Sequence, residues 1–342
     1  SLFVRQKEIY MRQKKFPVIM AVATCLLLLL VLVALCIGRY SISAAEVLRY
    51  LFLGIEENSM LKTVMWSVRI PRILMALLVG AGLSVSGVSL QAMFGNPLVN
   101  AHILGVSYSA GFGAALGILL FSRFAYVEIL ALLFGFVGMA LTYFLSQKKG
   151  NTGTLMLVLS GVVVGAVFEA LTSFIKYVAD PEEKLPAITY WLMGSLSAAG
   201  FGALKLGAPA IAVSCGVLLL LRWKLNLLPL PDEEARTFGT NIPRLRAVCI
   251  VCCAAMTASC VAMCGQVGWV GLLVPHVCRL LFGNSHARLL PACISCGACF
   301  LMIVDTLART ISAAEIPVSI LTAMLGAPIF ITIVRRKGGW SL

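Results

Sequence analysis

Charged side chains inside long apolar runs are the first candidates for chemistry in this sequence. Glu169 stands in the middle of one such run, and Asp305 and Arg309 stand four residues apart in another. A charged group in lipid costs about 2.5–3.5 kcal/mol on insertion scales, so each of these residues needs a partner or a role. Asp305 and Arg309 share a helix face at this spacing and are expected to pair. Glu169 is a candidate for lining a water-filled path, and a hydrogen bond to a neighbouring helix is an equally open alternative.

Arg69 and Arg72 flank Pro71 at the start of another apolar run. The loop charges described below place them on the external side, against the usual excess of basic residues in the cytoplasm. They could extend to lipid headgroups, as long basic side chains do near the ends of helices. Alternatively, they form a basic patch on which carboxylates of an external partner dock.

Motifs of nucleotide-hydrolysing and metal-binding proteins are not found. The chain has no Gly-x-x-x-x-Gly-Lys-[Ser/Thr] loop and no Ser/His/Asp or Cys/His set that suggests hydrolysis. Nothing in the spacing of His102, His276 and His286 requires them to converge on a metal ion. We therefore predict a protein that is not an enzyme, with no metal site and no cofactor in this chain. If the protein uses ATP, a separate ATPase subunit must bind the ATP and its Mg²⁺.

The elements that carry these residues are predicted to be membrane-spanning helices. The chain is 60% hydrophobic and only 12% charged, with a mean hydropathy of +0.98. About 20 apolar residues span the roughly 30 Å hydrocarbon core as a helix, which satisfies its own backbone hydrogen bonds. The sequence therefore predicts an all-α membrane protein, a single transmembrane domain over 1–342. It has roughly ten spans, at 17–37, 71–93, 101–121, 125–145, 153–177, 203–221, 245–264, 267–282, 289–311 and 317–334.

Basic residues indicate which side each loop faces. The formal net charge is +13, and lysine and arginine gather in the loops on one side of the predicted bundle. The positive-inside rule makes this side cytoplasmic, and it explains the charge better than nucleic-acid binding does. Residues 1–16 are then a cytoplasmic tail, 222–246 a cytoplasmic loop and 178–202 an external region with a short helix. An even number of spans places both termini in the cytoplasm.

Three shorter segments outside the spans are also expected to be helical. One lies around 44–53 in the external loop after the first span. A second, at 186–199, contains Tyr190 and Trp191 and suits a helix at the membrane interface. The third, in the loop 222–246, is expected to begin at Pro231 or Asp232 and to end at Gly239. A capped polar helix between two spans could bind a partner or serve as a solvated connector.

A short motif occurs twice in the chain. Ile70-Pro71-Arg72 recurs as Ile242-Pro243-Arg244, at the starts of the second and seventh predicted spans. Five spans separate the two copies, so they are expected on opposite faces of the membrane, as an inverted repeat requires. Chance also explains a match of three residues.

Ordered motifs from about residue 17 onward resemble those of the FecCD/BtuC-type permeases of ABC importers. The matches include Arg69–Arg72, Gly80–Gly87, Gln91, Asn96–Leu98, Ile103–Ser107, Gly265–Leu272, Val274–His276, Ala308–Arg309, Ile316–Pro317 and Gly326–Phe330. The resemblance implies a BtuC-like bundle that forms a homodimer in the bacterial inner membrane, with the pathway at the dimer axis. It also implies two cytoplasmic ATPase subunits and an external substrate-binding protein. The expected substrate is an iron complex, such as a ferric siderophore or haem, or cobalamin, carried by alternating access.

The resemblance also assigns roles to individual residues. The outer arginines that receive acidic residues of the binding protein match Arg69, Arg72 and Arg309. Positions near the cytoplasmic gate match Asn96, Pro97, Leu98 and Thr154. The part of the cytoplasmic loop that sits in a groove of the ATPase matches Asp232, Glu233, Glu234, Ala235, Arg236, Phe238 and Gly239.

One residue departs from the family pattern. A small or apolar residue is expected where Glu169 stands, so this carboxylate bears on substrate preference. An ion-coupled secondary transporter is the alternative outside the family, because it too would explain ten spans, a repeat and a carboxylate within a span. It predicts uptake driven by an ion gradient without an ATPase.

Overall fold

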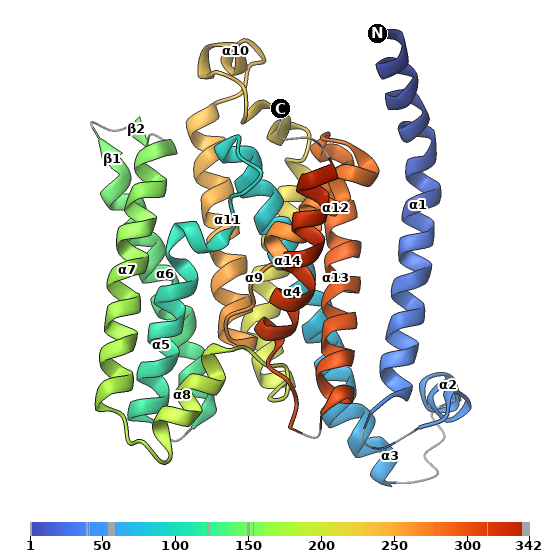
Figure 1. The fold of residues 1–342 in the computed structure, drawn as a ribbon, viewed down its shortest axis with the longest axis vertical. Helices are drawn as coiled ribbons and strands as arrows, with labels where there is room; N and C mark the ends of the chain where they lie inside the picture. The colour runs from blue at the N-terminus through green and yellow to red at the C-terminus, as the bar shows by residue number, and fades with distance from the viewer. Residues whose placement is uncertain are drawn as a thin grey trace.

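Apolar helices that run between the two ends of one bundle account for most of the described residues (Figure 1). The structure is a computed structural model that describes residues 2–38, 40, 42–53, 59–121, 123–148, 151–152, 154–312 and 314–336. The first half of the chain holds α1 (Leu2–Cys36), α2 (Ala44–Leu53), α3 (Ser59–Thr63), the π-helical turn η1 (Val64–Arg69), α4 (Ile70–Phe94), the 3-10 turn η2 (Ala101–Leu104), α5 (Val106–Leu120), α6 (Phe124–Ser146), β1 (Gln147–Lys148) and β2 (Asn151–Thr152). The second half holds α7 (Thr154–Val178), α8 (Lys184–Leu192), α9 (Phe201–Leu220), the 3-10 turn η3 (Lys224–Leu227), α10 (Asp232–Thr237), α11 (Ile242–Cys264), α12 (Val270–Phe282), α13 (His286–Ile311) and α14 (Val318–Arg336).

Each predicted span corresponds to a helix, which confirms the all-α fold class. Within the described residues, seven helices are long and apolar enough to cross a bilayer. Three more are apolar but shorter: α5, α12 and the part of α14 over Val318–Thr332. The two short strands β1 and β2 pair antiparallel between α6 and α7. The fold is therefore a helical bundle with a small hairpin at one end.

Two predicted spans, 101–121 and 267–282, are interrupted near their starts. Gly105 takes a left-handed φ of 71° between η2 and α5. Trp269 takes a φ of 66° immediately before α12, which follows a non-helical segment. The side-chain amide of Gln266 donates to the carbonyl of Ser107 at 3.1 Å, so the two breaks lie next to each other. Apolar composition predicted both segments, but it carries no information on where a helix is interrupted.

The short helices outside the spans agree with the prediction only in part. The helix expected around 44–53 is α2, and it begins with a capping box. The backbone N–H and the hydroxyl of Ser43 donate to Glu46 Oε2 at 2.8 and 2.7 Å. These hydrogen bonds hold the pKa of Glu46 below its usual value, and the bond from the hydroxyl contributes most. The helix expected over 186–199 ends at Leu192, because Gly194 takes a left-handed φ of 72°. The second span is preceded by α3 and η1, which sequence did not predict.

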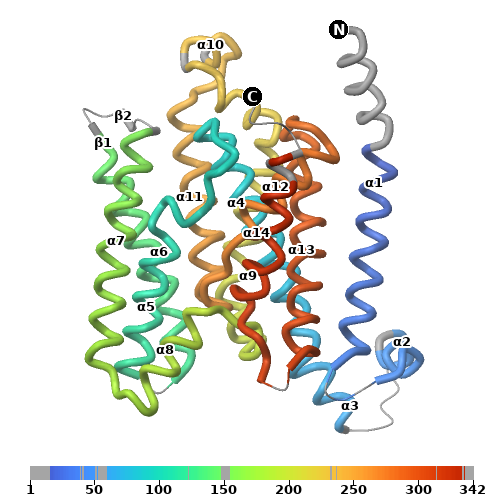
Figure 2. Tube along the Cα trace, viewed as in Figure 1, coloured from blue at the N-terminus to red at the C-terminus, as the bar shows by residue number. Residues whose placement is uncertain are grey.

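The elements outside the spans gather at the two ends of the bundle. α10, the β1–β2 hairpin, the start of α1 and the last described residues of α14 lie at one end, called here the α10 end (Figure 1, Figure 2). α2, α3 and α8 lie at the other, the α8 end. α4 starts at the α8 end and α11 at the α10 end, so the two Ile-Pro-Arg motifs lie at opposite ends as expected. The assignment of the α10 end to the cytoplasm stays a prediction from the loop charges.

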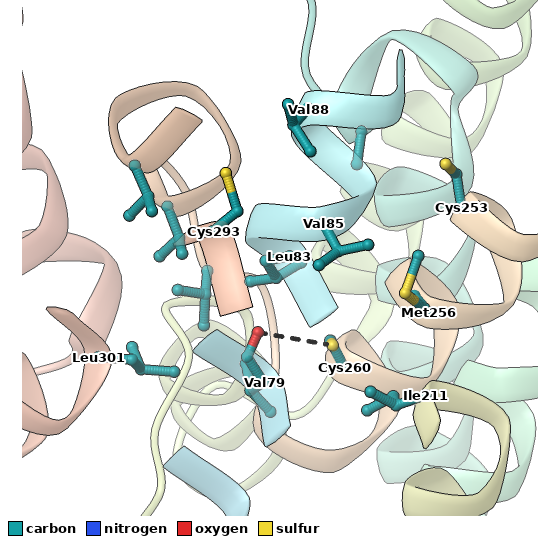
Figure 3. Packing of buried hydrophobic residues seen from close by; sticks show 14 of the residues in the cluster. Val79, Leu83, Val85, Val88, Ile211, Cys253, Met256, Cys260, Cys293 and Leu301 are labelled. Atoms are coloured by element: carbon teal, nitrogen blue, oxygen red, sulfur yellow. Dashed lines mark hydrogen bonds between the residues drawn. The ribbon is translucent and has the colours of Figure 1, made fainter. Parts of the chain in front are cut away.

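α4 lies at the centre of the bundle. Figure 3 shows Val79 and Val85 of α4 between Met256 and Cys260 of α11 on one side and Cys293 of α13 on the other. All five are buried. The Cys260 thiol lies 3.9 Å from the carbonyl oxygen of Val79, within hydrogen-bond reach for sulfur. α4 therefore packs against α11 on one face and against α13 on the other.

Glycines let other helices approach α4 at backbone distance. A Cβ added at Gly80 would lie 2.3 Å from the carbonyl oxygen of Gly297 in α13. One added at Gly87 would lie 2.0 Å from the carbonyl oxygen of Gly271 in α12. Helices in lipid associate through such contacts between small residues, because lipid tails are as apolar as the side chains themselves. The small residues seen in the sequence thus set the helix spacing.

Gly87→Ala is expected to destabilise the bundle, because the backbone of α12 must move to admit the methyl group. Overpacking of this kind costs about 1–3 kcal/mol, so the thermal unfolding temperature of the purified protein should fall. Gly216→Ala is the control, since a Cβ there meets nothing within 4 Å. Equal unfolding temperatures for the two variants would contradict this account of the α4–α12 contact.

Candidate functional site

Five charged residues from three parts of the chain meet at the α8 end and are called here the arginine cluster: Arg69, Arg72, Asp305, Arg309 and Glu315. Arg72 belongs to the first turn of α4, and Asp305 to the second half of α13. Nε and Nη2 of Arg72 donate to Asp305 Oδ1 at 3.0 and 2.8 Å. Nη1 and Nη2 donate to the two carboxylate oxygens of Glu315, both at 3.0 Å. The guanidinium of Arg72 is thus held by two carboxylates at once.

The other two arginines of the cluster hold the end of α1. A helix leaves its last carbonyls without partners inside the helix. Arg309 Nη2 donates to the carbonyl of Ala34 at 2.7 Å, and Arg69 donates to the carbonyls of Leu35 and Tyr40. Positive charge also suits the negative end of the helix dipole. The cluster therefore joins α1 to α4 and α13.

The predicted pair of Asp305 and Arg309 is present, but it is the weaker one. Arg309 Nε lies 3.9 Å from Asp305 Oδ2 and has no hydrogen-bond partner in the described part of the chain. The shorter contacts of Asp305 go to Arg72, 233 positions away in the sequence. The structure thus brings the three predicted docking arginines together. Arg69 and Arg72 are buried, the side chain of Arg309 is 9% exposed, and their role in docking stays a prediction.

The segment after α8 is tied to α14 and α11 beside the cluster. The backbone N–H of Val318 donates to Gly194 at 2.9 Å, and the hydroxyl of Ser319 donates to the carbonyl of Met193 at 2.6 Å. The N–H of Ser195 donates to the carbonyl of Cys264, at the end of α11. Trp191 is half-buried and packs against apolar residues of α5, α6 and α11, and its position at headgroup level stays a prediction. α8 is thus held by the bundle itself.

α10 projects from the opposite end of the bundle, between α9 and α11 (Figure 1). It begins at Asp232 as predicted, and Gly239 takes a left-handed φ of 69° after it. Ala235 is buried, whereas Glu233, Glu234 and Phe238 are exposed, Phe238 to 65%. The side chains of Asp232 and Arg236 lie outside the described residues. α10 presents acidic and aromatic side chains to whatever lies beyond this end.

The predicted gate residues also lie at the α10 end. Asn96 accepts a hydrogen bond from the N–H of Leu98 at 2.9 Å, which fixes the turn after α4. Leu98 is 46% exposed, and the side chain of Thr154 lies outside the described residues. The side-chain amide of Gln91 donates to the carbonyls of Val99 and Gly271 at 3.2 and 3.3 Å. Gln91 therefore ties this turn to α12, and the gate role of Asn96, Pro97, Leu98 and Thr154 stays a prediction.

Glu169 lies on an exposed face of α7 together with large apolar side chains. Val162 and Phe174 on the same helix are 57% and 62% exposed, and Met324 on α14 is 67% exposed. Glu169 therefore does not pack inside the bundle of a single chain. Its role in the pathway stays a prediction.

Comparison with known proteins decides the family. The model of the FecCD transport family matches residues 26–336. The chain belongs to the FecCD transport family. It is therefore a permease subunit of an ABC importer of the FecCD/BtuC type and a protein of the inner membrane, and an ion-coupled carrier is set aside.

Individual relatives of this FecCD-family chain carry different substrate names. The chain is 40% identical over 334 residues to the molybdate import permease MolB of Haemophilus influenzae, covering 96% of this chain and 99% of the relative. It is 33% identical over 318 residues to the hemin permease HmuU of Yersinia pestis, covering 91% of this chain and 94% of the relative. It is also similar to a solved structure of a metal-chelate type ABC transporter in an inward-facing conformation. That likeness has a TM-score of 0.85 and 41% identity, and covers 94% of this chain and 99% of the other.

Two carboxylates of this family member were missed from sequence. Glu315 is an acid in the short loop before α14, and no apolar run surrounds it to draw attention to it. Glu128 stands within the apolar run of α6 and is 8% exposed. A charge inside an apolar run is the same signal that singled out Glu169, so Glu128 could have been found.

Asp305→Asn is expected to destabilise the protein, because it removes the charge that compensates the buried guanidinium of Arg72. Loss of one partner of a buried ion pair costs about 3–5 kcal/mol, so the thermal unfolding temperature should fall clearly. Glu182→Gln removes an exposed carboxylate between α7 and α8 and should leave that temperature unchanged. A fall of the same size in both variants would contradict a structural role specific to Asp305.

Proposed function

We propose that two copies of this chain form the pathway of an importer that carries a bulky metal complex into the cell by alternating access. The single observation that carries this proposal is the family match across residues 26–336. Two ATPase subunits bind at the α10 end, and an external binding protein docks at the α8 end. ATP and Mg²⁺ are bound by the ATPase subunits, and this chain needs no cofactor.

The exposed surfaces of the single chain support this assembly. α7 and α14 expose large apolar side chains, and in the proposed dimer a second copy covers them equally on both subunits. In the dimer, Glu169 then lies close to the axis and lines the pathway from both sides. The exposed Glu233, Glu234 and Phe238 of α10 suit a groove of the ATPase.

The proposed mechanism couples the state of the ATPase to the position of α10. ATP draws the two ATPase subunits together, and α10 moves with the groove that holds it. Each nucleotide state must favour one conformation of the permease through a difference in interaction energy. The turn at Asn96–Leu98 and the start of α7 at Thr154 open or close the α10 end of the pathway.

The proposed substrate is an iron chelate, haem or cobalamin. The relatives carry such names, and a pair of Glu169 carboxylates repels a small, multiply charged anion more than a complex whose charge is low or spread over many atoms. Molybdate is the second candidate, favoured by the 40% identity to a molybdate permease over 96% of this chain. Repulsion between Glu169 and an oxyanion argues against it.

Replacing Glu233 and Arg236 together by alanine is expected to uncouple ATP hydrolysis from uptake. The complex should still hydrolyse ATP, but uptake per ATP should fall about tenfold or more, because α10 no longer follows the groove. The measurement compares uptake and phosphate release in vesicles that contain the whole transporter. Arg335→Ala, an exposed basic residue at the same end, is the control and should leave the ratio unchanged. An unchanged ratio in the double variant would refute the coupling role of α10.

Uptake of labelled candidates tests the substrate. Vesicles with the whole transporter should accumulate an iron–siderophore, haem or cobalamin when ATP is supplied, and should not accumulate molybdate. Glu169→Gln should raise molybdate uptake relative to the wild type, because it removes like charge from the pathway. Strong molybdate uptake by the wild type would make molybdate the substrate and would remove the proposed role of Glu169 in excluding anions.

A further inference from the structure

Arg72 is held between two carboxylates whose positions differ. The side chain of Asp305 is 4% exposed and belongs to a long helix of the bundle. The side chain of Glu315 is 19% exposed and belongs to the loop between α13 and α14. Both make hydrogen bonds of 2.8–3.1 Å to the same guanidinium. Asp305 is thus the fixed partner of Arg72, and Glu315 is the partner that a molecule arriving from outside meets first.

The arginine cluster has one positive charge more than it has carboxylates. Arg72 contacts both Asp305 and Glu315, Arg309 contacts Asp305, and Arg69 donates to backbone carbonyls. Nε of Arg309 has no hydrogen-bond partner in the described residues. A partly buried guanidinium without a full set of partners favours the approach of another carboxylate. The cluster can therefore take a carboxylate from outside while Asp305 stays in place.

Glu315 also lies next to the contacts that hold the segment after α8. Three residues further on, the N–H of Val318 donates to Gly194 at 2.9 Å. The N–H and hydroxyl of Ser319 donate to the carbonyl of Met193 at 3.2 and 2.6 Å. The ion pair of Glu315 therefore fixes the loop whose end holds both the start of α14 and the end of α8.

We infer that Glu315 occupies the place of a partner's carboxylate on Arg72 and is displaced when that partner docks. The partner chemistry is an exposed aspartate or glutamate side chain of the external binding protein, so the inference rests on the proposed function. Docking exchanges one carboxylate for another on Arg72, and the charge of the buried guanidinium stays compensated throughout. The freed loop then loosens the hydrogen bonds of Val318 and Ser319 to the end of α8. Docking outside is thereby linked to movement of α8 and α14.

Glu315→Gln tests the inference, because the amide keeps the size of the side chain and removes its charge. The exchange of the amide hydrogens of Val318 and Ser319 with deuterium is measured by mass spectrometry on the complete permease dimer in lipid nanodiscs. Exchange at these two residues should become about tenfold faster in Glu315→Gln. Glu182→Gln, an exposed acid at the same end of the bundle, is the matched control and should leave it unchanged. Unchanged exchange in Glu315→Gln would overturn the inference.

A binding measurement tests the competition itself. The probe is the external binding protein that co-purifies with the wild-type transporter, and its dissociation constant is measured for each variant in nanodiscs. Glu315→Gln should bind it about tenfold more tightly, because the partner no longer competes with an internal carboxylate. Equal or weaker binding would overturn the inference. Failure of any binding protein to accompany the wild type would count against the proposed function, and the exchange measurement would still decide whether Glu315 holds the loop.

Discussion

The buried charge of Arg72 is the constraint on which the α8 end depends. A guanidinium removed from water needs carboxylates with good geometry, or its burial costs several kcal/mol. Asp305 and Glu315 supply them, and this draws α4, α13 and the loop before α14 to one point. Arg69 and Arg309 then bind the carbonyls at the end of α1. The arginine cluster therefore also fixes the position of α1.

Close backbone contact sets the spacing along the rest of the bundle. α4 touches α13 at Gly80 and α12 at Gly87, and its apolar side chains meet α11 on the other side (Figure 3). The middle of α4 is therefore held by backbone contacts, whereas the loop of Glu315 and the end of α8 are held by an ion pair and a few hydrogen bonds.

The sequence predicted the elements well and the contacts between them poorly. Apolar run length located the spans, and the short helix expected around 44–53 is α2. The partnership of Arg72 with Asp305 joins positions 233 apart, so no local pattern reports it. At the break before α5, the hydroxyl of Thr142 in α6 donates to the carbonyl of Leu104 at 3.0 Å, and apolar composition does not report such a contact. The roles in docking, gating and coupling came from family resemblance. The structure adds where the residues predicted for those roles lie.

The breaks before α5 and α12 are joined by a hydrogen bond between neutral groups, whereas the α8 end is held by ion pairs. Irregular backbone at membrane depth survives only where protein or enclosed water covers it. Here the side-chain amide of Gln266 donates to the carbonyl of Ser107, which is a neutral hydrogen bond between the two halves of the chain. Ionic strength weakens ion pairs near the surface such as that of Glu315, whose side chain is 19% exposed, but it does not screen a hydrogen bond between neutral groups. High salt is therefore expected to loosen the Arg72–Glu315 contact at the α8 end of this permease and to leave the Gln266–Ser107 hydrogen bond between the two breaks intact.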